Sequence, residues 1–587
     1  MTTATRNILH QTISFVAIVL FSSFLGISAA ASTPLPIVYQ PLVPGTVAPG
    51  NPAFTLTING TGFASGAVVY WNGSARSTTF VSGSRLTAAI SASDVASPTT
   101  ASVSVKNPGQ TARSNVVFLS VTAPLPSFVI SQADYPLSSS QGGTIIAVVP
   151  GDFNGDGKMD FAAMSVNISG SDSVFILLGN GDGTLQPPFQ YGIGVDSRDL
   201  VSGDFNGDSI LDLAATSELD GTVSIFLGNG DGTFRPQPAL AVGTNPRHLA
   251  AGDFNGDGKL DLAVATQTDV TILLGNGDGT FRAPLNTSEP DGPLSITAGD
   301  FNQDGKLDVA LGTLDNNGTG NTATVYLGKG DGTFQPAKHF SLPYYSGGDI
   351  KAADVNGDGK LDLAVAGTFL AVLIGNGDGT FQAGVDYGTE TDMLSVAFGD
   401  FNGDGKLDIV GAAAGSSSRY KPVLYLGNGD GTFQNQIAFG TFVTTQSAAP
   451  VDINGDGALD VAVGEGSITG NLDLLLQGTF NLNPKIRFSP AQLNFGNVRV
   501  GHSATRTTIM ADSGKGPFTG TFSFRGTGYN QFSQTSTCPT TVYPGGSCNV
   551  TVTFTPTAPE TLRVVLEVTD NATNKKQLVL ITGAGVQ

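Results

Sequence analysis

The chain has 587 residues, of which 13% are charged and 78 are glycine. This length exceeds what one hydrophobic core supports, and the composition favours many short strands joined by tight turns over helices. The net charge of −20 disfavours nucleic acid and anionic membrane surfaces as partners, because their phosphates repel it.

Residues 1–31 have the pattern of a secretory signal. Arg6 supplies a positive charge, Ile13 to Ile27 is largely apolar, and Ser28 to Ala31 are the small residues that signal peptidase needs. The alternative is an uncleaved membrane anchor, but the apolar run is short for a bilayer span of about 20 residues. We therefore expect cleavage, a secreted or cell-surface product, and no membrane insertion afterwards.

Residues 35–122 alternate apolar and polar side chains between turn signals such as Asn59-Gly60, which predicts a small β-sandwich. The segments Ile58 to Phe63 and Val68 to Gly73 resemble an IPT/TIG immunoglobulin-like domain. The only tryptophan, Trp71, has two interpretations: a platform for a ligand, or packing in the sandwich. Packing is the commoner role and is the one we expect.

A nine-residue acidic phrase recurs seven times between residues 152 and 460. It reads DFNGDGKLD in its most regular copies, from Asp253 and Asp400, and a second phrase, typically LGNGDGTF, follows in six of the seven repeats. Apolar runs between these phrases predict four strands per repeat, the size of a propeller blade. The second phrase is expected to form a turn rather than a metal site.

Seven repeats predict a closed ring, a seven-bladed β-propeller over residues 126–482. The last repeat lacks the second phrase, while the segment Phe128 to Tyr135 resembles the fourth strand of another repeat, Phe381 to Tyr387. We expect this N-terminal strand to complete the last blade, because an open array would leave exposed sheet edges.

The acidic phrase predicts calcium, at about one ion per blade. Positions one, three, five and nine carry side-chain oxygens and position seven offers a backbone carbonyl, a donor set that suits calcium better than magnesium. Three carboxylates in one loop repel one another unless a cation lies between them. The alternative is an Asx-turn network without metal, and seven near-identical copies favour calcium over it. The predicted ligands are Asp152, Asn154, Asp156, Asp160, Asp204, Asn206, Asp208, Asp212, Asp253, Asn255, Asp257, Asp261, Asp300, Asn302, Asp304, Asp308, Asp354, Asn356, Asp358, Asp362, Asp400, Asn402, Asp404, Asp408, Asp452, Asn454, Asp456 and Asp460.

Two copies depart from the phrase. Ser209 replaces the glycine at position six of the second copy, so that turn is expected to be strained and its ion weaker. Gln303 replaces a glycine at position four of the fourth copy, a position that we expect to be less critical.

These phrases closely resemble the FG-GAP/VCBS repeat family, whose propellers include the head of integrin α chains. The resemblance covers about residues 126–482. It implies calcium in the inter-strand loops of each blade and a role in adhesion or ligand binding, without identifying a ligand.

Residues 485–587 predict a second β-sandwich. The segments Phe488 to Pro490, Leu493 to Gly496 and Val552 to Pro556 resemble the ASH-like, choice-of-anchor D immunoglobulin-like domains of exported bacterial proteins. The only two cysteines, Cys538 and Cys548, lie here, and in an exported protein we expect a disulfide between them rather than two free thiols.

The predicted fold class is therefore all-β, a seven-bladed propeller flanked by two immunoglobulin-like sandwiches. After the signal only His248, His339 and His502 remain, and none stands at zinc-ligand spacing. The repeated aspartates do not suit a glycosidase, because an active site is a unique constellation.

We predict a non-catalytic, secreted calcium-binding protein that acts in adhesion or binds an extracellular glycan or protein. The alternatives are an enzyme of the polysaccharide-lyase kind, for which basic residues are scarce, and a passive cell-envelope scaffold.

Overall fold

The computed structural model describes residues 34–587, apart from short internal segments. These segments are 123–129, 138–142, 168–170, 315–320, 343–347, 389–391, 414–420, 440–443, 467–469, 478–484, 514–517, 540–541, 543–545 and 571–576. The predicted signal sequence, residues 1–31, lies outside the described residues.

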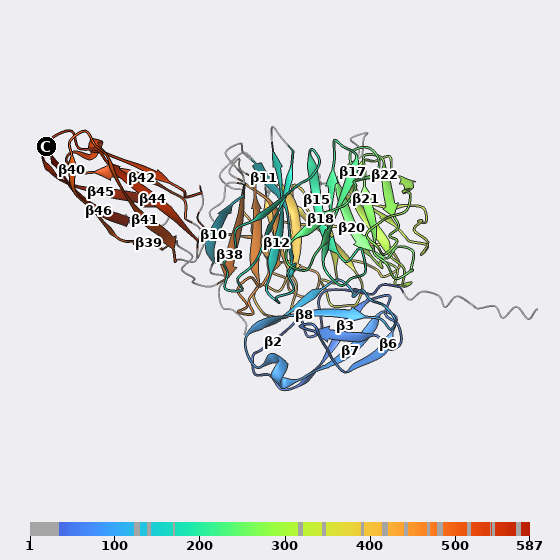
Figure 1. Ribbon diagram of the computed structural model, residues 1–587. Helices are drawn as coiled ribbons and strands as arrows, with labels where there is room; N and C mark the ends of the chain where they lie inside the picture. The colour runs from blue at the N-terminus through green and yellow to red at the C-terminus, as the bar shows by residue number, and fades with distance from the viewer. Residues whose placement is uncertain are drawn as a thin grey trace, which may run out of the picture. The chain divides into compact units, whose positions relative to one another are not determined.

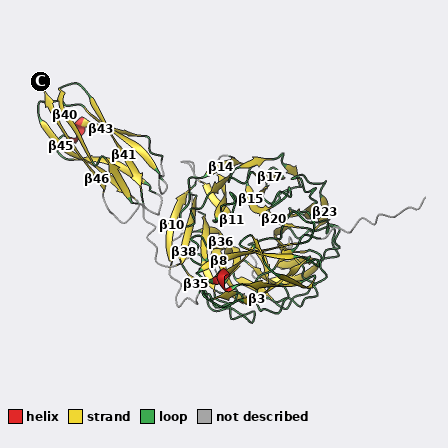
Figure 2. Cartoon of the chain, turned by 60° about the horizontal axis from the view of Figure 1, so that its bottom comes forward, coloured by secondary structure: helices red, strands yellow, loops and turns green. Residues whose placement is uncertain are grey.

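The described chain is all-β. Strands dominate, and its two helices are short 3₁₀ turns, Ala92–Val95 and Tyr529–Gln531 (Figure 2). In the part of the chain that is described, neither helix has the length and hydropathy that a membrane-spanning helix needs. The all-β part of the predicted fold class, which rested on the high glycine content and the alternating patterns, is therefore confirmed.

The N-terminal sandwich consists of two sheets that share one core. One sheet has the order β1 (Ile37–Val38), β3 (Phe54–Thr61), β7 (Arg85–Ile90), β6 (Thr78–Ser82); the other has β2 (Thr46–Val47), β9 (Val117–Val121), β8 (Thr99–Lys106), β4 (Val68–Trp71), β5 (Ser74–Ala75). Alternate residues such as Leu56 and Ile58 point into the core. Trp71 is 1% exposed and belongs to that core, so its expected packing role is confirmed.

Seven sheets of four or five strands follow, one for each acidic phrase (Figure 1). The first sheet has the order β11 (Gly143–Gly151), β12 (Asp160–Asn167), β13 (Ser173–Leu177), β14 (Phe189–Gly192). The second has β15 (Ser197–Gly203), β16 (Asp212–Ser217), β17 (Thr222–Gly228), β18 (Phe234–Pro236), and β19 (Leu240–Ala241) also pairs with β17. The third has β20 (His248–Gly252), β21 (Asp261–Ala265), β22 (Asp269–Leu273), β23 (Leu285–Ser288). The fourth sheet has β24 (Pro293–Gly299), β25 (Asp308–Thr313), β26 (Asn321–Tyr326), β27 (Lys338–Leu342). The fifth has β28 (Ile350–Ala353), β29 (Asp362–Val365), β30 (Leu370–Leu373), β31 (Val385–Tyr387). The sixth has β32 (Met393–Gly399), β33 (Asp408–Ala413), β34 (Val423–Tyr425), β35 (Ile437–Ala438). The last is β36 (Thr445–Val451), β37 (Asp460–Glu465), β38 (Asn471–Gln477) and β10 (Ile130–Pro136).

The fourth strand of the last sheet comes from the N-terminal side of the repeats. β10 pairs antiparallel with β38, with Tyr135 opposite Leu472, which confirms the strand expected there; residues 128–129 of the predicted segment lie outside the described part. The first strand of each sheet contacts the first strand of the next sheet, and β36 in turn contacts β11.

The two recurring phrases pack neighbouring sheets together. Phe153, from the first acidic loop, meets Phe234 of the next repeat edge to face, with ring centroids 5.6 Å apart. The Phe153 carbonyl also accepts a hydrogen bond of 3.2 Å from the Gly232 backbone. The same pair of contacts joins Phe254 and Phe301 to the repeats that follow them. Phe205 accepts the equivalent hydrogen bond and makes a tilted ring contact with Phe281. Edge-to-face contacts of this kind add to area burial, so both phrases have a packing role.

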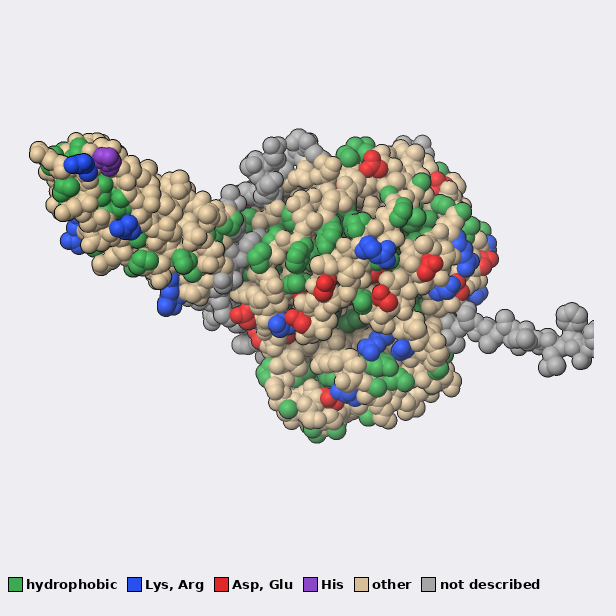
Figure 3. All heavy atoms as spheres, viewed as in Figure 1, with side chains coloured by type: hydrophobic (Ala, Val, Ile, Leu, Met, Phe, Trp, Pro, Cys, Tyr) green, Lys and Arg blue, Asp and Glu red, His purple; other side chains and the backbone are tan. Residues whose placement is uncertain are grey.

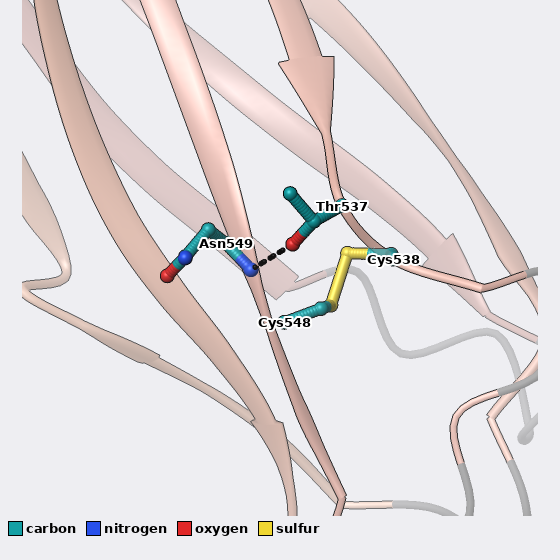
Figure 4. The surroundings of a disulfide bond; sticks show 4 residues. All are labelled: Thr537, Cys538, Cys548 and Asn549. Atoms are coloured by element: carbon teal, nitrogen blue, oxygen red, sulfur yellow. Dashed lines mark hydrogen bonds between the residues drawn. A yellow bond between two sulfur atoms is a disulfide. The ribbon is translucent and has the colours of Figure 1, made fainter.

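The C-terminal sandwich also has two sheets. Their orders are β39 (Ile486–Ser489), β41 (Ala504–Asp512), β44 (Ser547–Phe554), β43 (Phe532–Ser536), and β40 (Gln492–Arg499), β46 (Gln577–Val586), β45 (Thr561–Asp570), β42 (Gly520–Arg525). Cys538 and Cys548 form the predicted disulfide next to the backbone pair Thr537 and Asn549, with Cα atoms 4.9 Å apart (Figure 4).

Candidate functional site

Each acidic loop connects the first strand of a sheet to the second. In the third sheet β20 ends at Gly252 and β21 begins at Asp261, so the loop Asp253 to Leu260 turns the chain at one end of the sheet. The other six loops have the same place in their sheets. The fold therefore puts all the predicted ligands at equivalent ends of the seven sheets.

A network of Asx turns holds each loop. In the third loop the Asp257 backbone N–H donates to Asp253 Oδ1 (3.1 Å) and to Asn255 Oδ1 (2.8 Å), and the Gly258 N–H donates to Asp253 Oδ2 (2.8 Å). These three bonds, and one from the residue at position seven to the Asp at position five, recur in all seven loops. The network considered as the alternative to calcium is thus present. It does not exclude a cation, since a carboxylate has about four lone-pair sites.

The aspartate at position nine has a structural role as well. Asp261 is fully buried; its Oδ2 accepts the Phe254 N–H (2.9 Å) and its Oδ1 accepts the Gly275 N–H (2.7 Å). It therefore ties the acidic loop to the end of the third strand. The equivalent residues do the same in the other sheets: Asp160, Asp212, Asp308, Asp362, Asp408 and Asp460.

These buried carboxyls hold their protons more tightly than usual. Burial, together with the charges of Asp253 and Asp257, raises the pKa of Asp261 to about 7, although two backbone N–H groups oppose the shift. Burial and neighbouring loop aspartates likewise raise the pKa of Asp212, Asp308, Asp362 and Asp408 to about 7 and that of Asp160 to about 6. The three carboxylates of a loop therefore interact electrostatically, as the sequence predicted.

The loops have the donor atoms that a hard cation needs, but their side chains are not gathered around one point. Every predicted ligand atom is a carboxylate or amide oxygen, the type that calcium selects. Within the described ranges, no three Asp, Glu, His or Cys side chains converge closely enough to hold a metal ion. In the loops this follows from the hydrogen bonds above, which hold the oxygens at positions one, three and five against the backbone. The calcium ligands therefore remain a prediction.

Both departures from the phrase fall on left-handed backbone. Ser209 has φ +69°, so the strained turn expected there is confirmed. Gln303 has φ +59°, and the glycine at the same position of other loops is also left-handed, for example Gly256 at φ +70°. The expectation that position four is less critical was wrong, because this position needs a positive φ as much as position six does.

The second phrase forms a turn. In the third sheet, Asp278 Oδ1 accepts both the backbone N–H of Thr280 (3.0 Å) and its hydroxyl (2.6 Å), and the Asn276 N–H donates to the Thr280 carbonyl (2.9 Å). These bonds occupy Asp278 within its own turn, as expected of a turn former.

The N-terminal sandwich contacts the acidic loops. The Leu35 N–H donates to Asp253 Oδ2 (2.7 Å), and the Asp300 N–H donates to the Tyr39 hydroxyl (2.8 Å). Thr61 Oγ1 also donates to Asp300 Oδ2 (3.3 Å). The sandwich thus donates hydrogen bonds to carboxylate oxygens of two predicted metal ligands, Asp253 in the third loop and Asp300 in the fourth.

Four further loops contact the sandwich. The Asp354 N–H donates to the Gln40 carbonyl (3.0 Å), and Ser209 Oγ donates to the Thr111 carbonyl (3.3 Å). At the sixth loop, Gly45 of the sandwich and Gly405 of the loop line the same cavity. At the seventh loop, Gly457 lies so close to the sandwich that a Cβ added to it would be 2.6 Å from the Val121 carbonyl oxygen. The first-position aspartates of loops three to seven are buried, at 9% exposure or less.

Sequence reasoning missed this contact surface. The strands of the sandwich and the acidic loops are each visible in the sequence, but the fit between them depends on surface shape. Leu35 and Gln40 make their contacts through backbone atoms, so their side chains give no signal.

Comparison with known proteins is in line with the repeats. The FG-GAP-like repeat matches six times, at residues 152–215, 204–264, 253–311, 312–365, 367–411 and 412–463, which together span more than half of the chain. The chain belongs to the FG-GAP-like repeat family. Residues 484–578 match the ASH domain, described as abnormal spindle-like microcephaly-associated, ASPM-SPD-2-Hydin.

Solved structures give weaker likenesses to this FG-GAP-like repeat protein. A lectin of Agrocybe aegerita, described as recognising non-reducing terminal N-acetylglucosamine, is 19% identical, covers 65% of this chain and 95% of its own, and has a TM-score of 0.39. The plexin A4 extracellular region is 10% identical, with 78% and 62% covered and a TM-score of 0.37. The Vibrio cholerae biofilm matrix protein Bap1 is 11% identical, with 76% and 88% covered and a TM-score of 0.18. With TM-scores below 0.5, none of them bears on fold or function here. No curated protein matches the chain.

Proposed function

We propose that this FG-GAP-like repeat protein is an extracellular, calcium-dependent binding protein for a glycan or protein ligand. In this proposal its seven sheets are the blades of a closed propeller. The unbroken series of contacts between first strands, with β36 against β11 and β10 completing the last sheet, supports closure. The N-terminal sandwich is proposed to be of the IPT/TIG immunoglobulin-like type, and residues 1–31 to be a cleaved secretory signal.

The observation that carries the calcium proposal is the buried aspartate at position nine. Burial and the neighbouring loop aspartates raise its pKa at all seven equivalent places, which means that its ionised form is destabilised there without a counter-charge. A bound divalent cation supplies compensating charge there. Asp253, Asn255, Asp257 and Asp261, and their equivalents, would hold it once they exchange backbone hydrogen bonds for the ion.

The proposed role is binding without catalysis. The acidic loops repeat almost unchanged, whereas a catalytic centre needs one unique set of groups. The disulfide between Cys538 and Cys548 supports an oxidising compartment outside the cytoplasm.

Metal analysis and a glycan array test the two parts of the proposal. Protein dialysed against calcium should retain several ions by mass analysis, and its unfolding midpoint should rise with calcium concentration, because a ligand of the folded state stabilises it. Magnesium serves as the control and should have a smaller effect. An unchanged midpoint together with metal-free protein would contradict calcium binding, and the absence of any ligand on glycan and protein arrays would contradict the binding function.

A further inference from the structure

Four ionisable side chains gather outside the acidic loops, and the proposed metal sites do not use them. His248 Nδ1 on β20 lies 3.3 Å from Asp199 Oδ2 on β15, and Lys351 Nζ on β28 lies 3.1 Å from Asp349 Oδ2 just before β28. We name these four residues the first-strand cluster. Three of them are partly open to solvent: 18% for the side chain of Asp199, 27% for His248 and 43% for Lys351.

The cluster spans the space inside the series of first strands. β15 and β20 are neighbours, but β28 belongs to the fifth sheet and is separated from β20 by β24 of the fourth. Even so, Lys351 interacts electrostatically with Asp199, and Asp349 interacts with His248. Groups from sheets that are not neighbours can meet in this way only across the middle of the proposed propeller.

The cluster lies at the ends of the strands away from the N-terminal sandwich. His248 begins β20, while the acidic loop follows Gly252 at its other end, about 15 Å away at the rise of a β-strand. The acidic-loop end is occupied by the sandwich through contacts such as Leu35 to Asp253. A ligand from solution therefore has better access to the cluster than to loops three to seven.

Charged and apolar groups also lie at the same end of the second and third sheets. Arg198 and Arg247, which adjoin Asp199 and His248 in the chain, both pair with the buried carboxylate of Glu218. Leu219, next to Glu218 in the chain, is 67% exposed. This end of the propeller thus offers donors, acceptors and an apolar contact.

We infer that the first-strand cluster is a binding site for an uncharged, hydroxyl-rich sugar. This inference rests on the proposed binding function. Two carboxylates face a lysine and a histidine, so the cluster has little net charge with which to attract an ion. A sugar hydroxyl both donates and accepts, and adjacent hydroxyls can therefore bridge a carboxylate and a cationic N–H.

The hydrogen-bonding capacity of the cluster is partly free. Asp199 accepts the N–H groups of Leu200 (2.9 Å) and Leu249 (3.0 Å) and faces His248. These three partners leave about one of the roughly four lone-pair sites of the carboxylate for a ligand. Lys351 has three N–H donors, of which Asp349 needs one. Burial lowers the pKa of His248, but Asp199 and Asp349 outweigh it and leave the pKa raised, which favours the form with two N–H donors.

The test uses the full-length protein on an array that carries neutral and uronic-acid oligosaccharides. Lys351→Met and His248→Gln should weaken binding of a neutral glycan at least tenfold. Lys338→Met and His339→Gln, on β27 outside the cluster, are matched controls and should leave it unchanged. Because the cluster variants remove ion pairs and can affect folding, a second measurement uses the wild-type protein. On addition of the glycan, the imidazole NMR signals of His248 should shift while those of His339 and His502 stay in place.

The outcomes separate this site from the proposed function. Glycan binding that survives both cluster variants, with an unmoved His248 signal, would place the ligand elsewhere and overturn the site but not the function. Preference for uronic-acid glycans would contradict the inference that the ligand is uncharged. Reduced thermal stability of the variants with unchanged affinity would assign the cluster a structural role only. No bound glycan or protein on any array would overturn the binding function itself.

Discussion

At the scale of single residues, the acidic loops depend on left-handed backbone at positions where the sequence does not always supply glycine. A non-glycine residue there costs roughly 1 kcal/mol. Ser209→Gly should therefore raise the free energy of unfolding by about 0.5–1 kcal/mol, after loss of the long hydroxyl bond to Thr111. Thermal melting measures the change.

Gly157 provides the matched control for this prediction. It holds position six of the first loop at φ +80°, and nothing lies within 4 Å of an added Cβ, so Gly157→Ser changes backbone strain without a clash. It should lower the midpoint by about as much as Ser209→Gly raises it. A destabilising Ser209→Gly would show that the hydroxyl contact outweighs the strain.

Asp473 is expected to make the stability of the last sheet depend on pH. It is 1% exposed on β38 and faces Asp134 on β10, and burial with the charges of Asp134 and Glu465 raises its pKa well above the usual value. A raised folded pKa means that stability is full below the unfolded pKa, near 4, and is lost as pH rises through the folded pKa. Asp473→Asn should abolish this loss and raise the melting midpoint more at pH 8 than at pH 5. Equal effects at both pH values would contradict the assignment.

At the scale of elements, the segment from β1 to β2 joins the N-terminal sandwich to the acidic loops. Tyr39→Phe removes the acceptor of the Asp300 N–H, which leaves a buried donor unpaired and should cost about 1–3 kcal/mol. Limited proteolysis within residues 35–122 should become faster, because the sandwich loses one of its contacts. Tyr529→Phe, at a residue that is 56% exposed in the C-terminal sandwich, is the control and should leave the rate of proteolysis unchanged. If both variants are digested like the wild type, the hydroxyl bond does not fasten the sandwich.

The elements themselves could be predicted because their signals are local. Alternation such as Phe54, Leu56 and Ile58 marks a strand with one buried face, and the recurring phrase fixes where each sheet turns. The double role of Asp261, as predicted ligand and as buried acceptor for Gly275, was not visible, because Gly275 lies 14 residues further along the chain. The first-strand cluster could not be predicted from the sequence for a related reason. Its members stand five or three residues before an acidic loop, and only the fold brings sheets two, three and five together there.

An alignment of the seven repeats on their acidic loops would have given one hint of the cluster. Five residues before each loop stand, in order, Ala147, Asp199, His248, Ser295, Asp349, Ser395 and Ser447. Four of these seven residues are small, and the three charged or ionisable ones, Asp199, His248 and Asp349, are members of the cluster.

At the scale of the whole molecule, charge is distributed unevenly. Residues 485–587 contain nine Lys or Arg and four Asp or Glu, a net charge of +5, so the remainder of the chain has −25. On the face of the C-terminal sandwich seen in Figure 3, Lys and Arg side chains are visible and Asp and Glu are not. The negative charge is thus concentrated before residue 485, where the acidic loops contribute 21 aspartates. Repulsion among these charges is the physical reason to expect that stability depends on both pH and calcium.

The aspartates at position nine make this dependence on pH and calcium specific. Without calcium, the ninth-position aspartates have pKa values raised to about 6 in the first loop and to about 7 in loops two to six, against about 4 when unfolded. Their contribution to stability is therefore complete below about pH 4 and is lost as pH rises through 6 to 7. In EDTA, the melting midpoint should fall between pH 5 and pH 8. Calcium should reverse this fall, with a gain that is larger at pH 8 than at pH 5, because the ion competes with protons for the same carboxylates. Magnesium at equal ionic strength controls for screening. A midpoint in EDTA that is flat from pH 5 to pH 8 would show that the buried aspartates are already compensated by their backbone hydrogen bonds, and the electrostatic argument for calcium would then fail.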